Sequence, residues 1–203
     1  NTAYTPEEVS YFVENSGARL VLCDQAKHAG MAPVAKACGA ELATMNADGS
    51  GTFADVAATM PDSFATVDRT LDDLAAFLYT SGTTGRSKGA MLTQGNLLSN
   101  AETLVSEWQF TKDDVLLHAL PIFHTHGLFV ASNIILLTGG QMIFLPAFDV
   151  DQIIENLPKS TSLMGVPTFY TRLLGDPRFP KALVPHMRLF VSGLSLIPFA
   201  RSH

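Results

Sequence analysis

Short apolar runs alternate with amphipathic segments along most of the chain, and this alternation restricts the possible folds more than any other feature. The runs are short enough for strands, and the segments between them repeat apolar residues at helical intervals. Strands are predicted at residues 75–79, 89–92, 115–120, 141–145, 162–166 and 188–191, and helices at residues 93–108, 127–137, 150–157 and from 167 onward. Strands separated by helices form βαβ units. The sequence therefore predicts an α/β fold in which layers of parallel sheet are covered by helices.

The first 70 residues follow the same pattern less regularly. Thr5, Pro6 and Glu8 combine a capping hydroxyl, a first-turn proline and a glutamate three residues after the cap, which predicts a helix that ends near Gly17. A strand and a second helix are expected next, at residues 19–23 and 26–38. Weak periodicity indicates an irregular connection after them, over residues 40–70, with one short helix at residues 53–60.

Composition and charge exclude several classes of protein. With 47% hydrophobic and 16% charged residues, the composition is globular, so disorder over most of the length is not expected. The net charge of −6 disfavours nucleic acid as a partner. The longest apolar stretch, residues 128–137, is polar at two positions and too short to span a bilayer. The two cysteines have no metal-binding spacing and favour a reducing compartment, so we expect a cytoplasmic protein, or a mitochondrial-matrix protein in a eukaryote.

The segment from Thr80 to Gly89 combines glycines with hydroxyl and cationic side chains. Glycines let backbone N–H groups approach a ligand closely, hydroxyls add donors, and Arg86 and Lys88 supply positive charge, so the loop suits a phosphate chain. It is not a Walker loop, because Ser87 precedes Lys88 where that loop has glycine. A surface hairpin rich in turn residues is the alternative interpretation.

A second polar segment, residues 120–127, lies at the end of a predicted strand. Ligands of open α/β sheets gather at strand ends, so His124 is well placed to touch a substrate. Two other interpretations stay open. His124 could cap a helix, or it could form an HxH metal pair with His126, with His118 nearby, although a metal would need further ligands from unrelated positions.

The string Thr80-Ser81-Gly82-Thr83-Thr84-Gly85-Arg86-Ser87-Lys88-Gly89 resembles the phosphate loop of the adenylate-forming superfamily of acyl-CoA synthetases, luciferases and peptide-synthetase adenylation domains. The segment ending in His124 resembles that superfamily's Pro-x-Phe-His motif, whose histidine lies near the carboxylate being activated. Further segments are similar to malonyl-CoA synthetases, at residues 1–5, 90–93, 117–121, 142–146 and 165–172. The resemblance implies that residues 1–203 are part of the large N-terminal, AMP-binding domain of an adenylate-forming enzyme.

Enzymes of this kind condense a carboxylate with ATP to an acyl-adenylate and pyrophosphate, after which the CoA thiol displaces AMP. The resemblance therefore implies malonate or methylmalonate as substrate, with ATP, Mg²⁺ and coenzyme A. Carboxylate attack on the α-phosphate brings anions together, and fixed cations offset the repulsion. Arg86, Lys88 and His124 are the residues expected at this centre.

The remaining roles also come from the resemblance. Nucleotide binding is expected from the loop residues Thr80, Ser81, Gly82, Thr83, Thr84, Gly85 and Lys88. Thr84 is a candidate Mg²⁺ ligand, and Thr125 and His126 are candidates for the wall of the acyl pocket. Arg172 is a candidate partner for the free carboxylate of malonate, although an arginine on a helix is more often in a solvated or structural ion pair.

Two departures from the family pattern stand out. Gln94 takes the place of a common histidine at a helix start, where either residue can cap, and residues 194–203 diverge from the family. Because the chain opens at Asn1 without an initiator methionine, we interpret it as the interior of a longer protein whose C-terminal domain is the missing partner. Two alternatives stay open: another short- or medium-chain acyl-CoA synthetase, or a truncated, non-catalytic fragment that at most binds nucleotide weakly.

Overall fold

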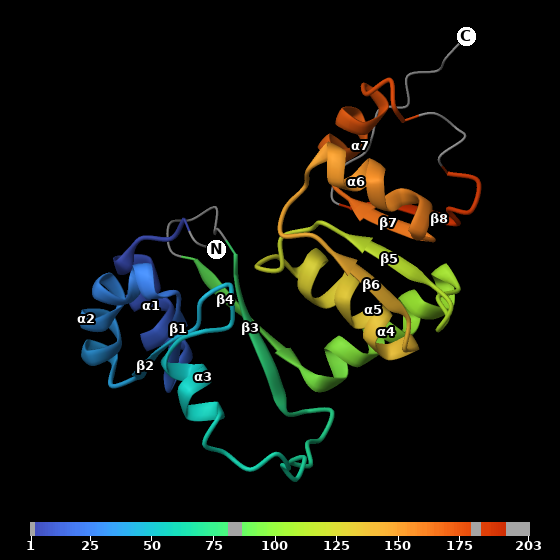
Figure 1. Cartoon of the computed structure of the whole chain (residues 1–203). Helices are drawn as coiled ribbons and strands as arrows, with labels where there is room; N and C mark the ends of the chain where they lie inside the picture. The colour runs from blue at the N-terminus through green and yellow to red at the C-terminus, as the bar shows by residue number, and fades with distance from the viewer. Residues whose placement is uncertain (1–2, 81–86, 180–183, 194–203) are drawn as a thin grey trace. The chain divides into compact units, whose positions relative to one another are not determined.

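A computed structural model describes residues 3–80, 87–179 and 184–193 of the chain (Figure 1). The chain divides into two compact units, each considered by itself. Unit one comprises Asn1–Thr70 and Ala76–Leu92, and unit two comprises Leu71–Ala75 and Thr93–His203. Among the described residues, no helix has the length and apolar character needed to cross a bilayer.

Unit one begins with the helix that the capping signature predicts. In α1 (Pro6–Ser16), the Thr5 side chain accepts a hydrogen bond from the Glu8 amide, the Glu8 carboxylate accepts one from the Thr5 amide, and Gly17 ends the helix with φ 65°. The later elements are β1 (Leu20–Cys23), a 3₁₀ turn η1 (Gln25–Lys27), α2 (His28–Cys38), β2 (Glu41–Thr44) and α3 (Thr52–Ala57). The strands β3 (Leu74–Thr80) and β4 (Lys88–Thr93) pair with each other.

The interpretation of residues 40–70 as irregular apart from one helix is wrong for β2. The short helix is confirmed as α3, but Glu41–Thr44 pairs in parallel with β1, with Val21 opposite Leu42. Four residues that include glutamate and alanine carry little strand propensity of their own. The hydrogen bonds of a neighbouring strand, which local sequence does not reveal, are what make this segment a strand.

Unit two contains a parallel sheet whose described strands run in the order β6-β5-β7-β8. The strands are β5 (Val115–His118), β6 (Gln141–Phe144), β7 (Ser162–Gly165) and β8 (Leu189–Ser192). The other elements are α4 (Gln94–Trp108), a π-helical turn η2 (His126–Ala131), α5 (Ser132–Thr138), α6 (Val150–Asn156), a 3₁₀ turn η3 (Leu157–Lys159) and α7 (Pro167–Leu174). The predicted helix-covered parallel sheet is confirmed.

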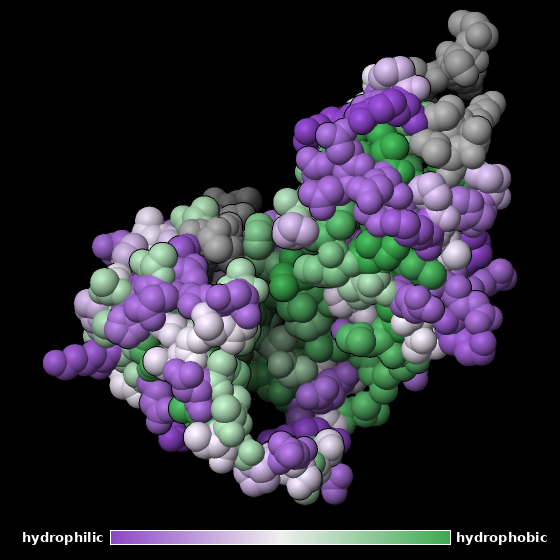
Figure 2. All heavy atoms as spheres, viewed as in Figure 1, coloured by the Kyte–Doolittle hydropathy of each residue, from purple (hydrophilic) through white to green (hydrophobic). Residues whose placement is uncertain are grey.

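The two faces of this sheet hold separate apolar cores, because successive side chains of a strand point to opposite faces. Leu116 packs with Ile134 and Ile135 of α5 on one face, whereas Leu117 packs with Ile153 of α6 and with Leu173 on the other. All six side chains are almost fully buried, and each contributes about 1.5–3 kcal/mol on removal from water. Hydrophobic residues also gather on the surface around α4 and α5, where Leu98, Leu136 and Leu137 are exposed (Figure 2).

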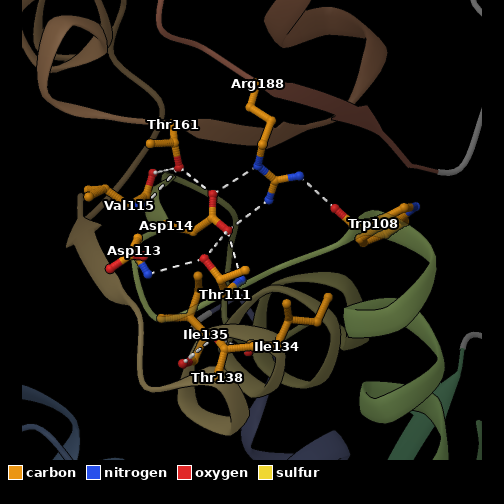
Figure 3. A network of polar contacts seen from close by, with 10 residues as sticks. All are labelled: Trp108, Thr111, Asp113, Asp114, Val115, Ile134, Ile135, Thr138, Thr161 and Arg188. Carbon is orange, nitrogen blue, oxygen red and sulfur yellow. Dashed lines mark hydrogen bonds and ion pairs between the residues drawn. The ribbon is translucent and has the colours of Figure 1, made fainter.

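A polar network ties together the segments that enter the strands of this sheet (Figure 3). The carboxylate of Asp114, just before β5, accepts two hydrogen bonds from the Arg188 guanidinium, at 3.0 and 2.9 Å, and one from the Thr161 hydroxyl at 2.7 Å. Arg188 also donates to the Trp108 carbonyl at 2.6 Å. Burial acts to raise the pKa of Asp114, but the bonds from Arg188, from the Thr111 amide and from Thr161 outweigh it, so the pKa lies below its ordinary value.

Candidate active site

The predicted phosphate loop lies between two paired strands of unit one. Thr80 is the last residue of β3 and Lys88 the first of β4, so the predicted order of strand, glycine loop and strand is confirmed. Six residues expected to bind nucleotide or metal, or to act at the reacting centre, lie outside the described residues: Ser81, Gly82, Thr83, Thr84, Gly85 and Arg86. The Lys88 side chain is exposed at the start of β4.

The base of the loop is anchored on α1 by tyrosines that the sequence analysis did not identify. The Tyr11 hydroxyl donates to the Ser87 carbonyl at 2.9 Å, and the Tyr79 hydroxyl donates to the Asn15 side-chain oxygen at 2.8 Å. A Cβ on Gly89 would lie 3.0 Å from the Tyr79 ring, so glycine allows this close packing. The strands that carry the loop are therefore fixed to a helix from the start of the chain.

The second predicted segment follows β5 in unit two. His124 is exposed, and its ring lies against Phe123 with 4.6 Å between ring centroids. Thr125 and His126 line one cavity of about 350 Å³. The rest of that lining comes from α4, η2 and the end of β8, through Leu104, Trp108, Val130, Val191, Ser192 and Gly193. Two of the three expected substrate residues in this segment thus share a cavity wall.

This cavity is apolar except for a few polar atoms. His126 Nδ1 and the Ser192 hydroxyl are buried and have no hydrogen-bond partner within the described part of the chain. Burial lowers the pKa of His126, and the neighbouring His118 lowers it further, so the ring is neutral at pH 7. A neutral imidazole and a hydroxyl in apolar surroundings suit a ligand that is mainly apolar with a polar group.

His118, which the sequence analysis mentioned only in the metal interpretation, has a different environment. It is fully buried, and its Nε2 lies 2.9 Å from the Gly127 carbonyl oxygen. Its ring also lies 4.9 Å from the Phe144 ring, measured between centroids. No group of three or more His, Cys, Asp or Glu side chains suited to a metal occurs among the described residues.

Arg172 is not among the residues that line the cavity shared by Thr125 and His126. Its guanidinium lies 5.1 Å above the ring of Phe148, which stacks on Phe169. Both phenylalanines line a second cavity of about 440 Å³, together with Phe123 and the segments that follow β5 and β6. The structure thus pairs Arg172 with an aromatic ring and does not place it at the cavity wall formed by Thr125 and His126.

Comparison with known proteins bears on both segments. The model of the AMP-binding enzyme family matches residues 1–198. The chain belongs to this family. Among curated members, a mitochondrial malonate–CoA ligase from Xenopus laevis is 30% identical over 97% of the chain, and a feruloyl-CoA synthase from Amycolatopsis is 37% identical over 63% of it. The chain spans 36% and 26% of these two relatives.

Solved structures of family members superpose closely. ATP-bound MatB from Rhodopseudomonas palustris matches with a TM-score of 0.91 and 58% identity, over 95% of this chain and 38% of that one. A benzoate CoA ligase from Burkholderia xenovorans matches with a TM-score of 0.77 and 26% identity, over 95% of this chain and 39% of that one. Both sequence motifs thus occur in a chain with the fold of this enzyme family.

Proposed function

We propose that this chain is the phosphate-binding and acyl-binding part of an AMP-forming acid–thiol ligase that activates malonate or methylmalonate. The carboxylate attacks the α-phosphorus of ATP, pyrophosphate leaves, and the CoA thiolate then displaces AMP from the acyl-adenylate. The observation that carries the proposal is 58% identity with ATP-bound MatB over 95% of the chain. Identity at that level over almost the whole chain supports the same reaction class.

The described part of the loop fits a polyanionic ligand. Lys88 presents a cation where β4 begins, and the strands on both sides are anchored by Tyr11 and Tyr79. In this proposal Lys88 and Arg86 offset the negative charge of the phosphates, and backbone N–H groups of residues 80–85 hydrogen-bond phosphate oxygens. A Mg²⁺ ion, with Thr84 as a candidate ligand, would supply further charge neutralisation to the phosphates.

In unit two, His124 is proposed to contact the reacting carboxylate, and Thr125 and His126 to bound the acyl group. The cavity wall described above supports the second role, because it combines both residues with apolar side chains from α4 and β8. The role of Arg172 toward a second carboxylate stays a sequence-based prediction, because its guanidinium lies over Phe148, which lines the other cavity.

The same cavity favours one rival within the ligases. A lining that is mostly apolar suits a monocarboxylate with an apolar tail better than the dianion of malonate. Another short- or medium-chain acyl-CoA synthetase therefore stays the second candidate.

Pyrophosphate exchange into ATP separates these candidates. We expect the complete protein to exchange in the presence of malonate and methylmalonate, and to do so faster than with acetate. Equal or faster exchange with acetate would remove the malonate assignment. The 203-residue chain is assayed in parallel, because exchange by this chain alone would remove the non-catalytic interpretation of it.

A further inference from the structure

The π-helical turn η2 carries His126 to the cavity, and the carbonyl of the next residue, Gly127, accepts several hydrogen bonds. This oxygen accepts the backbone N–H of Ser132, the bond that defines a π-turn, and also the Ser132 hydroxyl at 2.9 Å. His118 Nε2 approaches the same oxygen at 2.9 Å from β5. Donors from the strand and from the helix thus converge on one carbonyl next to His126.

The contact fixes the protonation of His118. A carbonyl oxygen only accepts hydrogen bonds, so a nitrogen 2.9 Å away must carry the proton. His118 is therefore the Nε2–H tautomer, with a bare Nδ1 that has no partner in the described part of the chain. A second proton on this buried ring would lack an acceptor, and burial lowers the pKa of His118 accordingly. His118 is thus a neutral donor to the turn at pH 7.

The ring of His126 is confined on its other side as well. A Cβ on Gly193, at the end of β8, would lie 2.6 Å from His126 Nδ1, so the ring occupies the space that a side chain would need. A Cβ on Gly127 would collide with the Pro121 carbonyl, so the turn also packs directly on the segment that leaves β5. A shift of the Gly127 carbonyl is therefore expected to displace the adjoining His126, whose ring packs against Gly193 in the wall of the cavity.

We propose that His118, supported by Ser132, is a positioning residue that holds the Gly127 carbonyl and thereby sets the place of His126 in the wall of the acyl cavity. The inference rests on the proposed function, in which that cavity takes the acyl group. His118 touches no substrate and acts through the turn. Its loss is therefore expected to change carboxylate recognition more than ATP recognition.

The test compares His118→Met, His118→Gln and Ser132→Ala in the complete protein. Met fills similar space without a donor, whereas the Gln side-chain amide places an N–H close to the position of Nε2. We expect His118→Met to raise the carboxylate KM about tenfold and the ATP KM less than about twofold, since misplacing a wall residue affects only the ligand it contacts. His118→Gln should stay within about threefold of the unsubstituted protein, and Ser132→Ala should raise the carboxylate KM by about threefold.

His186→Met is the matched control. It removes another histidine Nε2 contact to a backbone carbonyl, that of Leu157 at 2.9 Å, from a residue outside the cavity lining. A role for His118 in stability alone would make both methionine variants less stable and leave both KM values unchanged, which would overturn the proposal. If His118→Met does not fold, a normal carboxylate KM in Ser132→Ala or a tenfold rise in His118→Gln would overturn it equally.

A spectroscopic measurement keeps this inference separate from the proposed function. In ¹⁵N-histidine-labelled complete protein, we expect His118 as the neutral Nε2–H tautomer, and we expect His118→Met, but not His118→Gln, to shift the His126 signals. An Nδ1–H tautomer, or unchanged His126 signals in His118→Met, would overturn the positioning role. If no carboxylate supports exchange in the unsubstituted protein, the proposed function fails, and the spectra still decide the role of His118.

Discussion

The phosphate loop of unit one and the His126 cavity of unit two are built in contrasting ways. The loop is one continuous segment, and its strands are fixed by contacts of Tyr11 and Tyr79 around its base. The cavity takes its lining from α4, from the turn after β5 and from the end of β8. The binding groups of a continuous loop are consecutive residues, so they stay together wherever the loop is placed. The residues of the cavity wall come from distant segments, so their positions depend on how the sheet aligns its strands. Substitutions should therefore act locally in the loop and at a distance in the cavity.

The largest effect is expected in the loop. Replacing both Arg86 and Lys88 with alanine in the complete protein should lower the pyrophosphate-exchange rate by about 10²–10³-fold, because fixed cations that stabilise developing charge are lost. Lys36→Ala, at an exposed lysine on α2, is the control and should leave the rate unchanged. An unaltered rate in the double variant would contradict the phosphate-binding role.

The second-largest effect is expected in the Asp114 network, which connects the segments that enter the strands of the sheet. Asp114→Asn weakens the network at the entrance to β5, β7 and β8 and leaves Arg188 without its carboxylate partner. We expect a loss of about 2–3 kcal/mol in the free energy of unfolding, since the carboxylate is buried but Arg188 is partly exposed. Urea unfolding measures it. Asp113→Asn, in a pair exposed on both sides, is the matched control and should change stability by less than about 0.5 kcal/mol.

Low pH should reproduce part of this loss in the free energy of unfolding. The pKa of Asp114 is lower in the folded protein than in the unfolded chain, so its carboxylate stabilises the fold at pH values above the unfolded pKa of about 4. This stabilisation falls as pH drops from that value through the folded pKa. Unfolding free energies of the unsubstituted protein and Asp114→Asn should therefore converge below about pH 4. A constant difference down to about pH 2 would contradict the lowered pKa.

A single methyl group should disturb the assembled wall. Gly193→Ala places a Cβ where the His126 ring lies, so the ring must move, and we expect the carboxylate KM to rise about tenfold with little change in the ATP KM. Gly30→Ala is the control, because a Cβ there meets nothing within 4 Å. An unchanged carboxylate KM in Gly193→Ala would show that His126 does not bound the acyl group.

The smallest effect is expected at Arg172. Because its guanidinium lies over Phe148, which lines the other cavity, Arg172→Ala should change the malonate KM less than about twofold. A rise of about tenfold for malonate but not for acetate would instead support the sequence-based prediction that Arg172 pairs with the second carboxylate. Steady-state exchange kinetics with both acids distinguish these outcomes.

Local signals predicted much of this fold because they depend on neighbours in the sequence. The capping box of Thr5 and Glu8, the Asp149 cap of α6 and the proline that opens α7 each mark a helix start within a few residues. The sequence did not predict the strand β2, because this segment becomes a strand only through its pairing with β1. His118 likewise appeared in the sequence as one member of a histidine cluster, and its bond to Gly127 depends on how the chain turns back after β5.

The sequence by itself determined most of the order of strands and helices, the family and the chemical character of the loop, because each is a property of consecutive residues. Only the tertiary structure decided that Thr125 and His126 share a cavity with α4 and the end of β8, that Arg172 lies over Phe148, and that His118 is a buried neutral donor. The physical reason is that burial, tautomer and pKa are set by groups distant in the chain, which packing alone brings into contact.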